Sequence, residues 1–368
     1  MPSTAEPLPL VRKLQLSGGR RVSLDASIGR GTQGRVYSGQ LSGEWGGQRN
    51  VAVKVFDFAD GDATVLGILT EAAQRGARVH HPHVAQTYDF DLSARDPFVV
   101  TELIEGGTLE TLMDGYTSVD QQLPQNLALL IAIKIAEGLS GALAAAQLVH
   151  GNLSPRDVLI SWSGEVKVTD FGLSAAASAI SMVRPVNTIT RLAFVAPEVA
   201  CGGPATARSD VFSLGIVLHL MVCGQRFSPH ISSREALSLV REGVVHKSLS
   251  EPQLLQPLRA ILRRCLEKDP ALRYAHAGEV AEDLKKIAVL LGIPDVPAYI
   301  ALAVEAVFGC EEEGFKDSNV AFESAPRDVH DAEIYEVLEA ELIAPPARES
   351  GFLEREVSPR VIIRRLGR

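Results

Sequence analysis

The stretch His150–Leu159, which reads HGNLSPRDVL, decides the fold of this chain. Four other short motifs accompany it in a fixed order: Ile28–Tyr37 (IGRGTQGRVY), Val51–Lys54 (VAVK), Asp170–Gly172 (DFG) and Ala196–Glu198 (APE). A glycine-rich motif alone is weak evidence, because dinucleotide-binding folds contain one too. Five motifs in this order and at these spacings are specific to one fold.

Together the motifs resemble those of the protein kinases. The segment His150–Leu159 has the length and frame of the kinase catalytic loop, and the Ala-, Leu- and Arg-rich style of the sequence resembles the bacterial serine/threonine kinases. The resemblance covers roughly residues 22–292. It implies an α+β, bilobal fold, with a small β-rich lobe at residues 22–104 and a larger helical lobe at residues 105–292.

Two terminal segments flank this domain. We expect a loose arm at residues 1–21 and an acidic, partly disordered extension at residues 293–368. Between residues 311 and 350 there are twelve acidic and three basic side chains, a difference that equals the net charge of −9 of the whole chain. The rest of the chain has no net charge, so its charge does not indicate a nucleic-acid partner.

The hydrophobic pattern is strand-like in the first part of the domain and helical in the second. Strands are expected on both sides of the glycine-rich loop and at residues 51–56 and 97–103, with a glycine-rich hairpin turn at residues 43–50. Helices are expected at residues 64–78, 125–147, 211–223, 235–242, 257–266, 277–291 and 297–308, the last with a proline in its first turn.

The composition suits a soluble globular protein, with 46% hydrophobic and 22% charged residues. The most apolar run, residues 127–149, is interrupted by Lys134 and Glu137, so no membrane-spanning helix is expected. The N-terminus lacks the pattern of a signal peptide. These features predict a cytoplasmic protein, whose well-separated cysteines are expected to be reduced core thiols: Cys201, Cys223, Cys265 and Cys310.

The resemblance implies an intact phosphate-binding half of the site. Gly29, Gly31 and Gly34 would let the loop lie close over phosphate oxygens, because no Cβ obstructs the approach. Lys54 would supply a positive charge to the α- and β-phosphates of ATP. In the family this lysine pairs with a helix glutamate, for which Glu71 is the only candidate.

The position of Glu71 leaves that pairing open. Glu71 stands one residue further from His81-Pro82 than is usual in the family. A pair between Lys54 and Glu71 would therefore require a bulge in the loop that follows the helix.

Both lobes would contribute to adenine binding if the resemblance holds. Val36, Ala52 and Leu159 would cover the two faces of the ring. Backbone groups of Glu102 and Ile104 would contact its edge. Without a nucleotide, Val36 and Leu159 would serve only as core residues.

Two carboxylates are predicted to hold Mg²⁺. Asp170 belongs to the motif that binds the metal in kinases. Asp157 stands where the family has a metal-binding asparagine, and a carboxylate is also a good ligand for a hard cation. The resemblance therefore implies that ATP and Mg²⁺ can both bind, with one extra negative charge beside the phosphates.

The half of the site that receives the phosphoryl group departs from the family. Asn152 replaces the catalytic aspartate, which accepts the proton of the substrate hydroxyl, and an amide is no base near neutral pH. Ser154 stands where serine/threonine kinases have a lysine, and Arg191 where they have a threonine. Three departures in one cluster indicate a site that is no longer arranged for peptide phosphorylation.

The residues that support the fold are kept. Asp210 resembles the helix aspartate that anchors the catalytic loop. Arg273 is placed like the family's partner for Glu198. A fold that keeps these residues and its nucleotide loop, but loses its catalytic base, is typical of a pseudokinase.

The sequence therefore favours an ATP-binding, nucleotide-sensitive scaffold or regulator. One alternative is a weakly active or atypical serine/threonine kinase that transfers the γ-phosphate with Asp157 and Asp170. Another is an interaction module that binds no nucleotide. A protein partner is expected to bind the acidic tail, where Ile334, Val337 and Leu338 share one face of an amphipathic segment at 333–343. Docking of this segment onto the protein's own helical lobe is an equal alternative.

Overall fold

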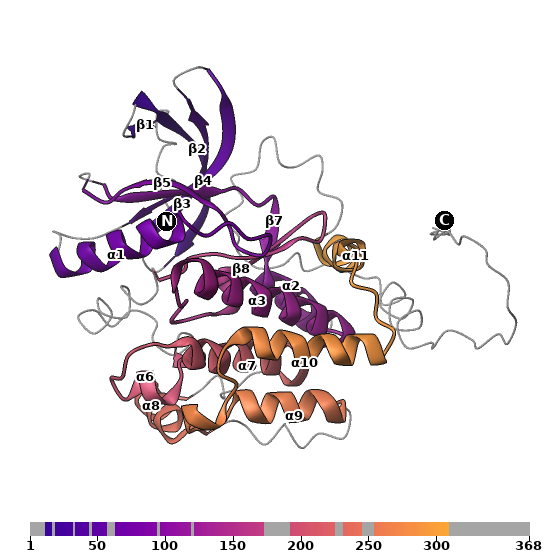
Figure 1. Cartoon of the computed structure of the whole chain (residues 1–368). Helices are drawn as coiled ribbons and strands as arrows, with labels where there is room; N and C mark the ends of the chain where they lie inside the picture. The colour runs from indigo at the N-terminus through magenta and orange to yellow at the C-terminus, as the bar shows by residue number, and fades with distance from the viewer. Residues whose placement is uncertain are drawn as a thin grey trace, which may run out of the picture.

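The chain folds into a small lobe rich in strands and a larger helical lobe (Figure 1). The computed structural model describes residues 12–16, 19–31, 34–43, 46–56, 63–93, 96–118, 121–172, 192–224, 231–244 and 254–308. This architecture confirms the predicted α+β, bilobal fold. The predictions for Arg191, Cys310 and the amphipathic segment at 333–343 lie outside the described residues.

The small lobe is a six-stranded antiparallel sheet with one helix packed on it. Its strands lie in the order β1-β2-β3-β4-β6-β5. The elements are β1 (Arg12–Gln15), β2 (Arg21–Gly31), β3 (Gly34–Ser42), β4 (Gln48–Phe56), α1 (Ala63–Gly76), β5 (Thr87–Asp91) and β6 (Phe98–Glu102).

Side chains alternate across this sheet, as the pleat requires. On β4, Val51 and Val53 are fully buried in one apolar cluster with Phe98 and Val100 of β6. The intervening Ala52 and the residues in step with it therefore point to the opposite face. That face looks toward the helical lobe, so the alternation determines which side chains of β4 can line a cleft.

The first strand, β1, differs from the sequence prediction. Its residues Arg12–Gln15 pair with Arg21–Leu24 of β2, whereas a loose arm was predicted through residue 21. Leu14 and Leu16 pack into the cluster of Val51 and Val53, and Leu16 is only 5% exposed. Burial of these two leucines supplies the free energy that orders the segment. The prediction of an arm was therefore wrong for residues 12–16.

The helical lobe contains a three-stranded sheet and eight α-helices within the part of the chain that is described. Its elements are β7 (Gly106–Thr108), α2 (Leu109–Ser118), α3 (Gln125–Ala146), β8 (Val158–Ser161), β9 (Val166–Val168), α6 (Pro197–Ala200), α7 (Ala207–Cys223), α8 (Ser233–Glu242), α9 (Gln256–Cys265), α10 (Ala277–Leu290) and α11 (Pro297–Phe308).

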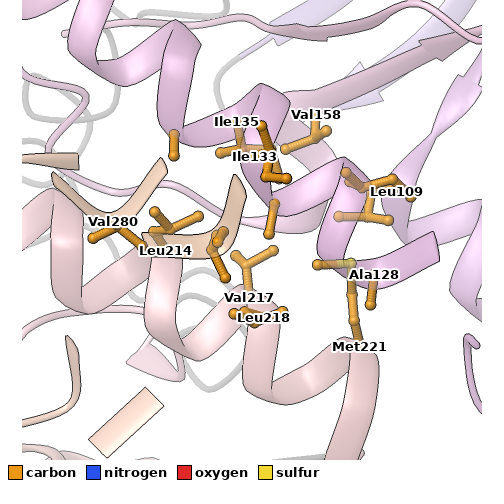
Figure 2. Packing of buried hydrophobic residues seen from close by; sticks show 14 of the residues in the cluster. Leu109, Ala128, Ile133, Ile135, Val158, Leu214, Val217, Leu218, Met221 and Val280 are labelled. Atoms are coloured by element: carbon orange, nitrogen blue, oxygen red, sulfur yellow. The ribbon is translucent and has the colours of Figure 1, made fainter. Parts of the chain in front are cut away.

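Helices α3 and α7 form the centre of this lobe (Figure 2). Ile133 and Ile135 of α3 face Leu214 and Val217 of α7 across a dry core, and all four are at most 1% exposed. By length and composition α3 is long and apolar enough to cross a membrane, but 67% of its most apolar window is buried inside the fold. Its apolar character is that of a central core helix.

Helix α11 has the predicted bounds and belongs to the helical lobe. Its residues Ile300 and Val304 are buried, and it packs against α2, α3 and β8. Two glycines permit the contact: a Cβ on Gly164 would meet the carbonyl oxygen of Pro297 at 1.9 Å, and one on Gly115 would meet Val307 at 2.0 Å. The folded domain therefore extends to residue 308, beyond the predicted end at 292.

The described cysteines form no disulfide with one another, as predicted, but not all of them are core residues. Cys265 is a buried free thiol, and burial raises its pKa to about 12. Cys223 is half-buried, but Cys201 is exposed and is therefore not a core thiol. It follows Pro197–Ala200, a helix of one turn that does not continue into the core.

A cluster of charges around Glu137 ties three parts of the helical lobe together. The Glu137 carboxylate lies 2.9 Å from Nζ of Lys285 on α10 and 3.3 Å from Nε2 of His83, and Lys134 is 3.7 Å away. Nδ1 of His83 lies 3.0 Å from the carbonyl oxygen of Val166 in β9. The hydrogen bond from His83 and the two ammonium groups lower the pKa of Glu137 to about 2.

We expect Glu137 to stabilise the fold in a pH-dependent way. A carboxyl group whose pKa is lowered on folding stabilises the protein above its ordinary value, near 4.5, and loses this effect as the pH falls toward 2. After allowance for solvent screening, the effect should be about 1–2 kcal/mol. Urea unfolding of the Glu137→Gln variant should show this deficit at pH 7 and a much smaller one near pH 2.5.

The matched control for this prediction is Glu282→Gln. Glu282 contacts the same Lys285 at 3.4 Å, but its side chain is 68% exposed. Its substitution should change the free energy of unfolding by less than about 0.5 kcal/mol at either pH. Equal deficits in the two variants would contradict the role assigned to Glu137.

Candidate functional site

The glycine-rich loop forms the ceiling of the cleft between the lobes. It is the β2–β3 hairpin, in which Gly29 pairs with Val36 and Gly31 pairs with Gly34. A Cβ on Gly34 would lie 1.9 Å from the carbonyl oxygen of Val55, so only glycine fits there. The two residues at the tip, 32 and 33, lie outside the described residues.

The register of the sheet brings the predicted nucleotide-binding residues to one face. Val36 is directly opposite Lys54 across β3 and β4, and Ala52 is opposite Thr101 across β4 and β6. Partners in a register share a face of the sheet. This face therefore carries an apolar strip and a single ammonium group above the cleft.

The segment that connects the two lobes and strand β8 of the helical lobe form the other sides of the cleft. Glu102 and Ile104 lie at the connection and are half-buried. Leu159 is half-buried on β8, while its neighbours Val158 and Ile160 point into the core. The half-buried side chain of Leu159 is thus the one on β8 that remains partly open to solvent beside the connection, and adenine binding by this set stays a prediction.

Lys54 pairs with the aspartate of the DFG motif. Its Nζ lies 2.5 Å from Oδ2 of Asp170, and both side chains are partly buried. Asp170 has a positive φ of 63°, a conformation that is uncommon for residues other than glycine and is concentrated at functional sites. The following Phe171 is buried against the ring of His150, with 5.1 Å between the ring centroids.

The predicted partner of Lys54 was wrong. Glu71 is 63% exposed and its carboxylate binds Arg75, four residues along the same helix. The inward position belongs to the next residue, Ala72, which is buried and faces the DFG motif: a Cβ on Gly172 would meet that of Ala72 at 2.8 Å. The offset of one residue that the sequence contains therefore remains in the structure, where α1 runs without a break to Gly76.

Small side chains on α1 leave a cavity behind the cleft. Ala72, Ala73 and Gly76 line it together with Thr101 and Phe171, and its volume is about 30 Å³. Sequence analysis did not predict this cavity. Its signal in the sequence is the absence of any large side chain at the inward positions of the last two turns of α1.

The catalytic loop is held by Asp210, as predicted. The two carboxylate oxygens of this buried residue accept hydrogen bonds at 2.8 Å from the backbone amides of His150 and Gly151. Nε2 of His150 lies 3.0 Å from the carbonyl oxygen of Thr169. The loop and the DFG motif are therefore fixed relative to each other.

Two of the three altered positions of the catalytic loop, Ser154 and Asp157, bind each other. Ser154 donates from both its amide and its hydroxyl group to Oδ2 of Asp157, at 2.9 and 2.8 Å. Asp157 is half-buried, and its burial, with the nearby charge of Asp170, raises its pKa. Asn152 is 5% exposed, and its buried Oδ1 has no hydrogen-bond partner in the structure.

These contacts give Ser154 a different task from the lysine it replaces. Its short side chain is used within the loop, where it caps the 3₁₀ turn at Pro155–Asp157 and binds the carboxylate of Asp157. It presents no positive charge to the cleft. Lys54 pairs with Asp170, and its positive charge also acts on Asp157.

Two ion pairs around the cleft were missed by sequence analysis. Lys167 of β9 lies 2.8 Å from the carboxylate of Glu102, which also accepts a hydrogen bond from the amide of Gln86. Arg156 of the catalytic loop lies 2.7 Å from Glu110 of α2. Each partner is distant in sequence, so no local pattern reveals the pairs before the fold is known.

The predicted support at the end of the activation segment is present. Arg273 binds Glu198 through two parallel hydrogen bonds of 2.8 Å, and Ser209 donates a third to the same carboxylate. The Arg273 side chain is completely buried and also donates to backbone carbonyls, including those of Glu267 and Lys268. Burial alone would raise the pKa of Glu198, but these hydrogen bonds outweigh it and lower the value.

ATP and Mg²⁺ fit the donor groups of this cleft. Asp157 and Asp170 place two carboxylates close enough for the charge of Asp170 to raise the pKa of Asp157, and hard oxygen ligands are those that Mg²⁺ prefers. Lys54 is close to both and would contact phosphates beneath a loop without obstructing Cβ atoms. The residues present therefore match a magnesium–nucleotide complex.

Comparison with known proteins gives the same family for the whole domain. The profile of the protein tyrosine and serine/threonine kinase family matches residues 22–283. Among curated proteins, the serine/threonine-protein kinase PknA of Corynebacterium glutamicum is 32% identical over 307 residues, 80% of this chain and 62% of its own length. PrkC of Bacillus subtilis is 30% identical over 261 residues, 70% of this chain and 39% of its own length.

Other bacterial relatives are similar to the same region. The serine/threonine-protein kinase PknL of Mycobacterium tuberculosis is 32% identical over 279 residues, 72% of this chain and 68% of its own length. The chain spans less than two-thirds of the length of the C. glutamicum and B. subtilis relatives. With its motifs, its two lobes and the match over most of its length, the chain belongs to the protein tyrosine and serine/threonine kinase family.

Proposed function

We propose that this chain is a pseudokinase that binds ATP and Mg²⁺ and acts as a nucleotide-sensitive scaffold or regulator. The observation that carries the proposal is the arrangement of Asn152, Ser154 and Asp157. An amide stands where a base is needed, and the serine that replaces the lysine is engaged with Asp157. The nucleotide half of the cleft retains its glycines and Lys54.

The same carboxylate argues against an alternative catalytic base. Asp157 would have to accept the proton of an incoming hydroxyl, yet its Oδ2 already accepts two hydrogen bonds from Ser154. With Mg²⁺ bound, its remaining lone pairs would face the metal. Asp157 is therefore better suited to hold a cation than to accept a proton from a peptide substrate.

A missing ion pair supports the proposal independently. Active kinases require the pair between the β-strand lysine and the helix glutamate. Here Ala72 occupies the inward position, and Lys54 binds Asp170 instead. The change removes one of the controls on catalysis without removing the groups that hold a nucleotide.

A weakly active serine/threonine kinase is the second candidate function. The pair of carboxylates at Asp157 and Asp170 favours it, because both are retained beside Lys54. Relatives that are about 30% identical are named as serine/threonine kinases. The two candidates differ in phosphotransfer and agree on nucleotide binding.

Nucleotide binding is tested by thermal unfolding of the full chain. At an ATP–Mg²⁺ concentration one hundredfold above Kd, binding should add about 2.7 kcal/mol of stability, which corresponds to about 5–10 °C in Tm for a domain of this size. The Lys54→Ala variant should lose most of this shift, because the charge that contacts the phosphates is removed.

The matched control replaces a lysine outside the cleft. Lys286 is 70% exposed on α10, and Lys286→Ala should keep the full shift in Tm. Unchanged melting of the wild-type protein at millimolar ATP and Mg²⁺ would overturn the nucleotide-binding proposal. It would favour an interaction module that binds no nucleotide.

A further inference from the structure

An exposed apolar patch lies where α10 ends and α11 begins. It is formed by Val289, Leu290, Leu291 and Val296, which are 79%, 81%, 45% and 45% exposed. Single exposed hydrophobic residues are common, but a cluster of large aliphatic side chains marks a site of interaction. The neighbouring Ile293 packs against the core, so the chain here is anchored while the four side chains remain open to solvent.

The size of the patch limits what can cover it. A stable interface between two copies of a protein buries about 800 Å² per partner, and four side chains do not supply that area alone. A tethered segment of the same chain needs far less, because its effective concentration reaches about 1 mM. At that concentration a contact with a Kd of only about 0.1 mM would be occupied roughly 10:1.

The chain between the end of α11 and the segment at 333–343 is long enough for that segment to reach back to the patch. The twelve residues of α11 separate Val296 from Phe308, which is about 18 Å at the rise of an α-helix. The 24 residues from 309 to 332 then lead to the segment at 333–343. A chain of this length has a root-mean-square span of about 25–30 Å, comparable to the distance it must cover.

The sequence of that segment is complementary to the patch. It reads EIYEVLEAELI, in which Ile334, Val337, Leu338 and Leu342 recur at helical spacing and four glutamates occupy other positions. No basic residue occurs in it. On α10, Lys285 and Lys286 precede the patch by one turn and are 41% and 70% exposed.

We propose that the segment at 333–343 docks on the patch formed by Val289, Leu290, Leu291 and Val296. Its apolar positions would cover the aliphatic side chains, and its glutamates would lie within reach of Lys285 and Lys286. The contact is intramolecular and is independent of the nucleotide cleft. It gives the acidic tail a defined place on the helical lobe.

The test is amide hydrogen exchange of the full chain, followed by mass spectrometry. Amides of residues 333–343 should exchange about tenfold more slowly in the wild type than in Leu290→Glu, because the introduced carboxylate repels the acidic segment. Leu338→Glu should abolish the same protection from the other side of the contact. Leu290→Glu alters a solvent-facing position, and unchanged exchange in α3 would show that the lobe remains folded.

The matched control is Leu272→Glu, which changes a leucine that is 60% exposed elsewhere on the helical lobe. It should leave the exchange of residues 333–343 as in the wild type. The proposal is overturned if Leu290→Glu has no effect on that exchange. It is also overturned if the protection grows with protein concentration, which indicates a second copy, or arises only on addition of another protein.

Discussion

Phosphotransfer to a protein substrate should be at least ~10²-fold slower than in a kinase that keeps the catalytic aspartate. General-base catalysis is worth about 10²–10⁴-fold, or roughly 3–5 kcal/mol of activation free energy. Asn152 supplies none of it, and Ser154 presents no charge to the γ-phosphate. The measurement is transfer of labelled γ-phosphate to a generic protein substrate and to the chain itself, with an active relative assayed in parallel.

Restoring the aspartate alone should recover little of this activity. In Asn152→Asp the base would return, but Ser154 would still bind Asp157, and Ala72 would still replace the helix glutamate. We expect no more than a few-fold gain from the single change. A larger gain should require Asn152→Asp with Ser154→Lys and Asp157→Asn, which together rebuild the loop pattern of the family.

One result would establish the rival function. Robust phosphotransfer by the wild-type protein that disappears in Asp170→Ala would show that the site is catalytic despite its altered loop. Activity that persists in Asp170→Ala would instead indicate a contaminating kinase, because that variant lacks the carboxylate expected to hold Mg²⁺.

The second large effect is expected on stability. Arg273→Met should reduce the free energy of unfolding by about 3–5 kcal/mol, the usual cost of breaking a buried ion pair. The substitution leaves Glu198 without its bidentate partner and leaves backbone carbonyls at residues 208, 267 and 268 without their donor. Chemical denaturation followed by circular dichroism would measure the difference.

A double-mutant cycle separates the ion pair from the other contacts. Glu198→Gln alone removes the charge but keeps a hydrogen-bond acceptor, and Arg273→Met with Glu198→Gln should cost less than the sum of the two single changes. The exposed Arg263 of α9 serves as a control, since Arg263→Met should change stability by less than about 0.5 kcal/mol. A similar small loss in Arg273→Met would contradict the structural role of the pair.

Much of the fold was predictable because its determinants are local. The apolar period of residues 125–146 and the proline at position 297 each predict a helix that the structure contains. The roles of Asp210 and Arg273 were predicted correctly from their positions relative to the motifs. The short helix α2 was missed, because its ten residues follow a glycine pair and include Gly115, whose role is to admit α11.

The site was less predictable where a shift of one position along a helix decides which side chain faces the interior. The sequence shows that Glu71 is offset by one position, but it does not show whether the loop or the helix absorbs the offset. Successive residues of a helix are turned by about 100°, so one position moves a side chain from the interior to solvent. The pairs of Lys167 with Glu102 and Arg156 with Glu110 depend on strands and loops that meet only in the folded chain.

The alanine at position 72 has a consequence for regulation. Kinases are commonly controlled by the placement of this helix, because its glutamate must reach the strand lysine before catalysis is possible. Here the helix carries no charge at that position, and its inward face packs through apolar contacts of Leu69, Ala72 and Ala73. A signal that arrives at α1 therefore cannot reach the nucleotide through electrostatics, and it must act instead through the shape and volume of the interior.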